Sequence, residues 1–329
     1  MRTCASLSPM QSVDPNTHIF SRRRCLGIGS AVLGATLLTR ARADAPAQPQ
    51  APGEREICSS SAPLAAARRV RTASAQTLAY EGTHILAFGA MQELAARYQG
   101  RTHLPIAITG GGCDDAIAAL RAGVADLGGL CCPVEATAIR NWPHLLVAHD
   151  WKAVVVHPGN PVDNLRKADL MRVASGDITS WRPLGGPDRP IALVVRQHCP
   201  DYVEPVRSIL LANQRRWSAR GLFVQTDEKI AQTCAAFESA LGIVSWVYAR
   251  PLVEAGALKL LRLNGVALSR ANGLGYPLTG PLTLAFRPGE QARVSPFLDF
   301  VLSAQGQSIL AENLIPAHPR QPLHSRVHA

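Results

Sequence analysis

From residue 77 onward, short apolar runs of strand length alternate with segments whose apolar residues recur at helical spacing. The strand-like runs are 77–80, 104–109, 125–130, 152–157, 191–196, 242–247 and 280–286, and the helix-like segments are 85–98, 114–122, 167–175, 202–213 and 295–310. The run 152–157 is apolar between its polar ends, as in a strand that is buried on both faces. This alternation predicts an α/β fold in which mostly parallel sheets are covered by helices.

The order of these elements predicts two lobes, with one larger continuous sheet as the alternative. We expect residues 77–150 and 250–320 to form lobe 1, and residues 151–249 to form lobe 2. The chain would then cross between the lobes near 149–151 and again near Tyr248. Two such crossings form a hinge, which suits closure around a ligand.

Residues 1–43 have the features of an export signal peptide. Arginines 22–24 precede the apolar run 25–38, and Ala-Arg-Ala at 41–43 is a small-residue cleavage site. The apolar run is too short to span a bilayer, and the paired arginines resemble a twin-arginine signal, with an ordinary Sec signal as the alternative. Residues 44–76 are rich in Ala, Pro, Gln and Ser and predict a flexible linker. We therefore expect a periplasmic protein with no stable membrane span after signal removal.

The charge of the chain does not indicate nucleic-acid binding. Of a net charge of +10 over 329 residues, about half lies within 1–43. No run of lysine and arginine with interleaved aromatic residues follows. We expect a monomer whose ligand is a small molecule or an ion.

Four short loops each follow a strand-like run, and three of them carry cysteine. They are 81–84, 110–113, 131–133 and 198–200. In an open α/β sheet, loops at the carboxyl ends of strands line the ligand cleft. The four loops are therefore predicted to converge on one pocket.

The second half of the chain carries a series of family-specific segments. They are 153–162, Gly-Asp-Ile-Thr-Ser-Trp at 176–181, Leu-Gly-Gly at 184–186, 190–196, Gly-Ile-Val-Ser at 242–245, 276–278 and Phe-Val-Leu-Ser at 300–303 followed by Gly-Gln at 306–307. Together they resemble the phosphate-binding periplasmic proteins of ABC transporters, the PstS-like family, over residues 78–318. The resemblance implies a two-lobe type II periplasmic-binding fold and a non-enzymatic solute-binding function, with an ABC transporter permease or a sensor as partner.

The resemblance also implies how a ligand is held. The family binds an oxyanion with backbone amides at helix N-termini, hydroxyl groups and an arginine, which suits the anion-binding chemistry of these groups. On the corresponding positions of this chain, the ligand-binding residues are Thr83, Gly111, Gly112, Cys113, Cys132 and Arg196.

The ligand loops depart from the family pattern. Cys113 is followed by Asp114 and Asp115, which can cap a helix but oppose an anion. Cys131 and Cys132 replace a Ser/Asp-rich turn, and the loop after Arg196 carries the sequence His-Cys-Pro in place of Ser-Gly-Thr. The ligand is thus phosphate or a related oxyanion, or else the anion site has been lost.

A thiophilic metal or metalloid is the alternative ligand on the same scaffold, and a soft metal ion is the one cofactor that the sequence suggests. Thiolate and imidazole suit soft ions such as Cu(I) and Zn. The ligands would be His84, Cys113, Cys131, Cys132, His198 and Cys199. Disulfides are the other interpretation of six cysteines in an oxidising compartment. Catalysis by a histidine-activated thiol is not expected, because His198 and Cys199 are adjacent in sequence and adjacent side chains usually point apart.

Overall fold

The computed structural model describes residues 76–196, 205–212 and 216–317, all within one compact unit, Glu54–Ala329. Its strands are β1 (Leu78–Thr83), β2 (Ile106–Gly111), β3 (Leu127–Leu130), β4 (His144–Val156), β5 (Asn164–Leu165), β6 (Ala192–Arg196), β7 (Leu222–Val224), β8 (Ala240–Ser245), β9 (Lys259–Leu260), β10 (Arg262–Leu263), β11 (Thr279–Ala285) and β12 (Ile315–Pro316). Its α-helices are α2 (His84–Leu86), α3 (Gln92–Thr102), α4 (Cys113–Ala122), α5 (Lys167–Ser175), α6 (Pro205–Leu211), α7 (Asp227–Ala236), α8 (Trp246–Glu254), α9 (Gln291–Leu302) and α10 (Ala304–Asn313). A π-helical segment, Ala87–Met91, joins α2 to α3.

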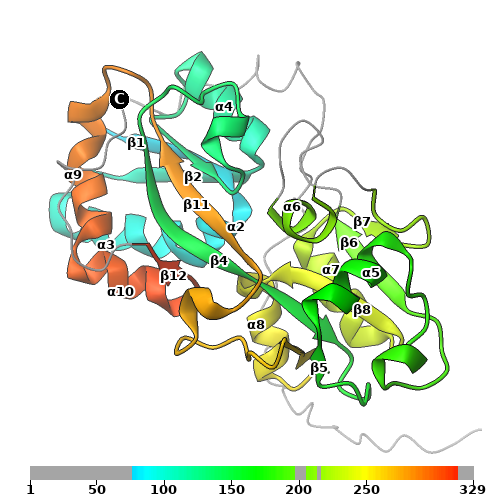
Figure 1. Cartoon of the computed structure of the whole chain (residues 1–329). Coiled ribbons are helices and arrows are strands. Elements are labelled where there is room, and N and C mark those ends of the chain that lie inside the picture. The colour runs from blue at the N-terminus through cyan, green and yellow to red at the C-terminus, as the bar shows by residue number, and fades with distance from the viewer. Residues whose placement is uncertain (1–75, 197–204, 213–215, 318–329) are drawn as a thin grey trace, which may run out of the picture. The chain divides into compact units, whose positions relative to one another are not determined.

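Two groups of strands share the long strand β4. The strand order is β2-β1-β3-β11-β4-β8-β6-β7, with β12 and β9 also paired to β4. β1 is parallel to β2 and β3, and β6 is parallel to β7 and β8, whereas β4 is antiparallel to both β11 and β8. Figure 1 shows β4 running from the first group of strands into the second. The α/β fold is confirmed, and antiparallel strands join its parallel parts.

The pairing partner of β4 changes between two adjacent residues. Trp151 is opposite Thr279 of β11, and Lys152 is opposite Ser245 of β8. The boundary expected between residues 150 and 151 thus falls within β4, next to this change. The division into lobes stays a prediction, because the described residues form one compact unit.

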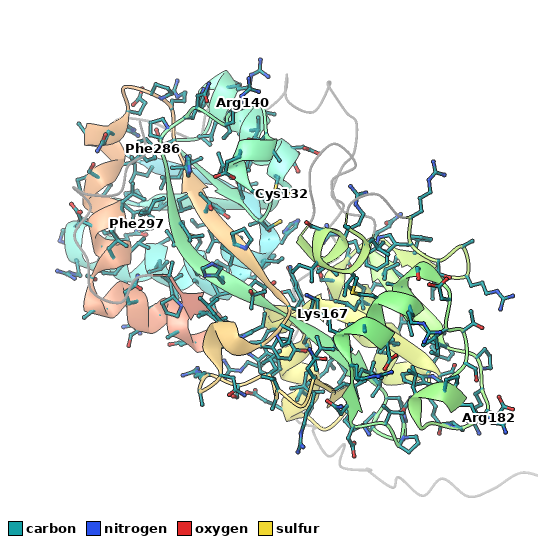
Figure 2. All side chains as sticks on the ribbon, in the orientation of Figure 1. Cys132, Arg140, Lys167, Arg182, Phe286 and Phe297 are labelled. Carbon is teal, nitrogen blue, oxygen red and sulfur yellow. The ribbon has the colours of Figure 1, made fainter. Side chains whose placement is uncertain are left out.

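Helices cover both faces of each strand group, as the apolar runs predict. In the first group, α3, α9 and α10 pack on one face and α4 on the other; Phe286 and Phe297 lie within the larger of these cores (Figure 2). In the second group, α5 and α6 enclose one core, and α7 and α8 enclose another. Alternate residues of β4 point into these two cores, which confirms burial on both faces for 153–156: Val154 and Val156 enter one core, and Ala153 and Val155 the other.

The Gly-Asp-Ile-Thr-Ser-Trp segment closes α5 and anchors the chain beyond that helix. Gly176 has a φ of 89°, in the left-handed region that glycine adopts without strain, and its N–H satisfies the last carbonyls of α5. Trp181 is fully buried, and its Nε1–H donates to the carbonyl of Ser239 over 3.0 Å. The segment therefore joins α5 to the start of β8.

Two expected elements are wrong in detail. The helix expected over 295–310 is two helices, because the Ser303 Oγ accepts the Gly306 N–H over 3.2 Å and caps α10. The strand expected to begin at residue 152 begins at His144, so its first half was missed. That half carries the buried Asp150, which breaks the apolar pattern.

The expected signal peptide, 1–43, and all but the last residue of the expected linker, 44–76, lie outside the described residues. Among the helices of the described ranges, none has both the length and the apolar character needed to cross a membrane.

Candidate functional site

Three of the four expected ligand loops lie at one edge of the first strand group. Thr83 ends β1 and is paired with Gly111, which ends β2. β3 runs parallel to β1 and ends at Leu130, just before Cys131. Because parallel strands end on the same edge, the loops at 81–84, 110–113 and 131–133 meet there, as predicted. His198 and Cys199, in the fourth loop, lie outside the described residues.

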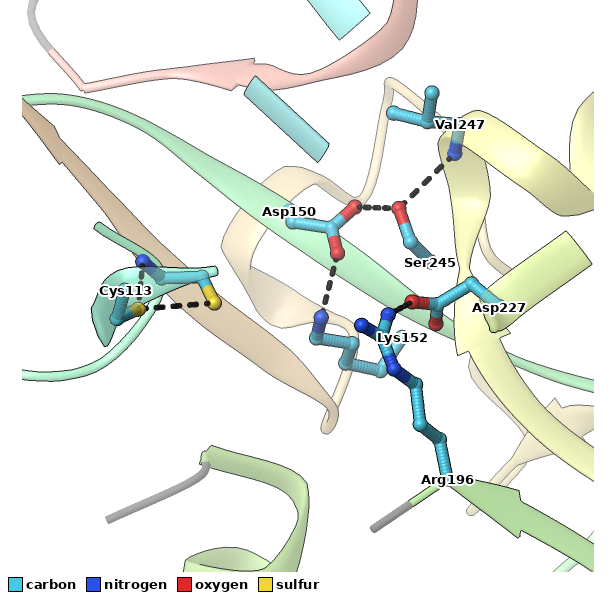
Figure 3. A network of polar contacts seen from close by, with 8 residues as sticks. Cys113, Asp150, Lys152, Arg196, Asp227, Ser245 and Val247 are labelled. Atoms are coloured by element: carbon cyan, nitrogen blue, oxygen red, sulfur yellow. Dashed lines mark hydrogen bonds and ion pairs between the residues drawn. The ribbon is translucent and has the colours of Figure 1, made fainter. Parts of the chain in front are cut away.

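These loops bring three cysteine thiols together. The Sγ atoms of Cys113 and Cys131 are 3.6 Å apart, and the backbone N–H of Cys131 donates to the Cys113 sulfur over 3.3 Å (Figure 3). The sulfur of Cys132 completes a triangle in which all three atoms lie within 4.8 Å of one another. Cys113 and Cys132 are buried, and Cys131 is partly exposed. All three residues are thiols and not half-cystines in this structure. We call them the thiol triangle.

The start of α4 is capped from within the protein. The N–H of Gly112 donates to the Asp115 carboxylate over 2.9 Å, which confirms that this aspartate caps the helix. Asp114 and Asp115 both lie in the first turn, where they offset the positive end of the helix dipole. The Gly112 amide is thus already engaged at the position where the resemblance implies an anion contact.

A histidine from the first loop fits against β2 because a glycine faces it. A Cβ atom on Gly110 would overlap the Nδ1 atom of His84. The His84 ring is buried and stacks in parallel on Phe88, with centroids 5.7 Å apart. The ring position therefore depends on the absence of a side chain at residue 110.

Arg196, at the end of β6, forms a buried ion pair. Its Nη1 donates to the Asp227 carboxylate over 2.6 Å, and the two side chains are only 5% and 3% exposed. Asp227 is the first residue of α7, a helix capped by the Thr226 Oγ1, which accepts the Lys229 N–H over 3.0 Å. Arg196, which the sequence analysis identified, is therefore held by the first residue of α7, a helix start that the sequence analysis did not identify.

A second buried ion pair lies on β4. Lys152 Nζ is 2.8 Å from the Asp150 carboxylate, and these side chains are 6% and 1% exposed. The Ser245 Oγ donates to the other oxygen of Asp150 over 2.9 Å and accepts the N–H of Val247 over 3.2 Å (Figure 3). Burial raises the pKa of Asp150, against the opposing effects of Lys152 and Ser245. The carboxylate is thus fixed from two sides.

Side chains of both ion pairs line one small pocket. Its lining is Lys152, Val195, Arg196, Val206, Trp217, Asp227 and Ile243. The charged part of this lining consists of an ammonium group, a guanidinium group and a carboxylate. The two cationic groups can donate hydrogen bonds to oxygen atoms of a ligand, and the carboxylate can accept a hydrogen bond from a hydroxyl group.

The electrostatics connect this pocket to the first loop. The pKa of His84 is lowered, first by burial and then by the positive charge of Arg196, while Asp227, Asp115 and Cys131 act in the opposite direction. Because charge effects weaken with distance, the influence of Arg196 and Asp227 on His84 indicates that residues of both strand groups contribute to one charged region. The downward direction of this pKa shift favours the neutral form of the His84 ring.

Sequence reasoning missed Asp150, Lys152, Asp227 and Ser245 as members of this site. The sequence did contain one signal for the pair on β4. Asp150 and Lys152 are two charged residues in a largely apolar strand, and charges are buried only when they are paired. Asp227 had no such signal, since a carboxylate is common in the first turn of any helix.

Comparisons with known proteins agree with this architecture. Residues 71–305 match the PBP superfamily domain. The chain is 22% identical over 174 residues to the phosphate-binding protein PstS of Borreliella burgdorferi, covering 50% of this chain and 62% of that relative, which is less than two thirds of its length.

Two solved structures have the same fold. One is a Clostridium perfringens protein described as a phosphate ABC transporter substrate-binding protein and solved with bound phosphate, with a TM-score of 0.63, 21% identity, and coverage of 73% of this chain and 99% of that one. The other is an ABC-type phosphate transport receptor from Vibrio cholerae, with a TM-score of 0.59, 22% identity and the same coverage. These similarities confirm the type II periplasmic-binding fold, and with the domain match they show that the chain belongs to the PBP superfamily.

Proposed function

We propose that this protein is a periplasmic solute-binding protein of the PstS-like type, which binds phosphate or a related oxyanion for an ABC importer or a sensor. The observation that carries the proposal is the pocket in which Arg196 and Lys152 lie together, both buried and both held by carboxylates. The named relatives, a phosphate-binding protein and an ABC-type phosphate transport receptor, support it.

The charges of the pocket suit an oxyanion that carries a proton. A guanidinium group can bind two oxygens of such an anion, and an ammonium group can bind a third. The Asp227 carboxylate would repel a fully ionised anion but accepts a hydrogen bond from a protonated oxygen. Hydrogenphosphate has such an oxygen and sulfate at neutral pH does not, so the pocket should favour phosphate over sulfate.

The protein acts as a receptor in this proposal and not as an enzyme. Its charged groups bind and orient an anion, and energy for uptake would come from the ATPase of the partner transporter. In this proposal the protein is a monomer that is exported through the twin-arginine route. It closes around its ligand, and the chain crossings near 149–151 and Tyr248 form the hinge.

The test is calorimetric titration of the purified mature chain with phosphate and with sulfate. We expect one phosphate per chain and weaker or no binding of sulfate. Arg196→Lys keeps the charge but loses the planar fork, so it should weaken phosphate binding at least tenfold, equivalent to about 1.4 kcal/mol. Equal affinity for the two anions, or no effect of Arg196→Lys, would contradict the proposal.

A further inference from the structure

We propose that the thiol triangle of Cys113, Cys131 and Cys132 is a binding site for a trivalent metalloid, of which arsenite is the simplest form. This site is separate from the proposed anion pocket, which contains none of the three sulfurs. It does not depend on the proposed phosphate function.

The first support is the number of ligands. Within the described ranges, the three cysteines are the one group of His, Cys, Asp and Glu side chains whose ligand atoms come together closely enough to hold an ion. Structural zinc sites in proteins almost always have four ligands in a tetrahedron. Three sulfurs suit a three-coordinate centre better.

The second support is the distance between two of the sulfurs. With metal–sulfur bonds of about 2.3 Å, the 3.6 Å separation of Cys113 Sγ and Cys131 Sγ corresponds to an angle of about 103° at the bound atom. That angle is typical of a pyramidal three-coordinate centre with a lone pair.

The third support is charge. The sulfurs lie in an apolar cluster formed by Ala116, Ile117, Leu120, Leu130, Val134, Ile139 and Ala285. Three thiolates around a trivalent centre are neutral as a whole, whereas the same thiolates leave two negative charges around Cu(I) and one around Zn(II). An unbalanced charge is costly in such surroundings, so the cluster favours the trivalent centre.

The binding reaction balances without any oxidant or reductant. One molecule of As(OH)₃ reacts with three thiols, three As–O bonds break, three As–S bonds form, and each thiol proton leaves with a hydroxide as water. Cys131 is partly exposed and gives the metalloid its route in.

The test uses the mature chain, reduced with a phosphine that is then removed, and sodium arsenite as the probe. After desalting, we expect one arsenic atom per chain by elemental mass spectrometry and the loss of three titratable thiols. Arsenic X-ray absorption should show three sulfur neighbours. Cys131→Ser should reduce retained arsenic at least tenfold.

Two variants serve as controls. Cys234→Ala removes a buried thiol on α7 that packs in a different core, and Cys58→Ser removes a cysteine that lies outside the four predicted ligand loops. Both should retain arsenic as the parent protein does. Circular dichroism confirms that each variant is folded. The arsenic X-ray absorption spectrum of the parent protein tests the site without any variant.

Several results would overturn the assignment. They are no retained arsenic, oxygen atoms in place of sulfur around the arsenic, unchanged retention in Cys131→Ser, or loss of retention in Cys58→Ser. Equal retention of Zn(II) by the same three thiols would also overturn it, because a divalent ion would then suit the site as well as a trivalent one.

Discussion

The guanidinium group of Arg196 lies 2.6 Å from the carboxylate of Asp227, and almost none of either side chain reaches solvent. The pair joins the end of β6 to the start of α7 and borders the proposed anion pocket. We therefore expect its two members to affect both folding and the proposed ligand binding, and these effects can be separated.

Arg196→Ala should lower the free energy of unfolding by about 3–5 kcal/mol, because it leaves a buried carboxylate without its partner. The double variant Arg196→Met, Asp227→Leu replaces both charges with apolar groups of similar size and should recover most of that loss. It should nevertheless bind no phosphate. Urea unfolding and calorimetry measure the two properties, and a double variant as unstable as Arg196→Ala would contradict this account of the pair.

Asp150→Asn should destabilise the protein by a similar amount, about 3–5 kcal/mol, because the Lys152 ammonium group would remain buried without a carboxylate. The matched control is Glu93→Gln, which breaks the pair between Glu93 and Arg97. Those side chains are 45% and 61% exposed, so this change should cost about 0.5 kcal/mol or less. Urea unfolding of both variants without ligand tests the contrast, which fails if the two losses are alike.

Gly82→Ala should be strongly destabilising, because the added Cβ would overlap the backbone of Gly129 on the neighbouring strand β3. Backbone atoms inside a sheet cannot move aside, so we expect a loss of about 3 kcal/mol or more. Gly100→Ala is the control, since Gly100 lies on α3 with nothing near its Cβ position, and alanine should stabilise the helix by about 0.5–1 kcal/mol. Thermal unfolding should shift in opposite directions for the two variants, and a shift in the same direction would contradict the structure.

Alkaline pH should destabilise the protein through two buried groups. Burial raises the pKa of Cys234 and that of Tyr276 to about 12. Between the ordinary pKa of each group and about 12, the native state keeps a proton that the unfolded chain has lost, so the free energy of unfolding falls as pH rises. Cys234→Ala should make this fall shallower by up to about 1.4 kcal/mol per pH unit. Urea unfolding over this pH range measures the slopes, and identical slopes with and without the thiol would contradict the expectation.

Most of the fold could be predicted because burial leaves a simple pattern in the sequence. A strand covered by helices on both faces is apolar at every position, as 153–156 of β4 is. The first half of β4 could not be recognised in that way, since Asp150 is buried there through an ion pair and not through apolar packing. The break between α9 and α10 was missed because one serine hydroxyl, that of Ser303, creates it.

The candidate site could be predicted only in part, for a geometric reason. Parallel strands end on one edge of a sheet, so the loop positions of Cys113, Cys131 and Cys132 were enough to place these residues together. The ion pair of Arg196 with Asp227 depends on how α7 packs beside β6, which local sequence patterns do not specify. His198 and Cys199 remain untested as ligands.

The change of partner along β4 has a mechanical consequence. Any rotation of one strand group against the other must twist the backbone between Trp151 and Lys152, where pairing with β11 gives way to pairing with β8. Lys152 lines the pocket, so a ligand held by its ammonium group also restrains the segment that must turn. In the proposed receptor, ligand binding at Lys152 would therefore stiffen β4 against torsion, and a partner in contact with both strand groups could detect the bound ligand without contacting it.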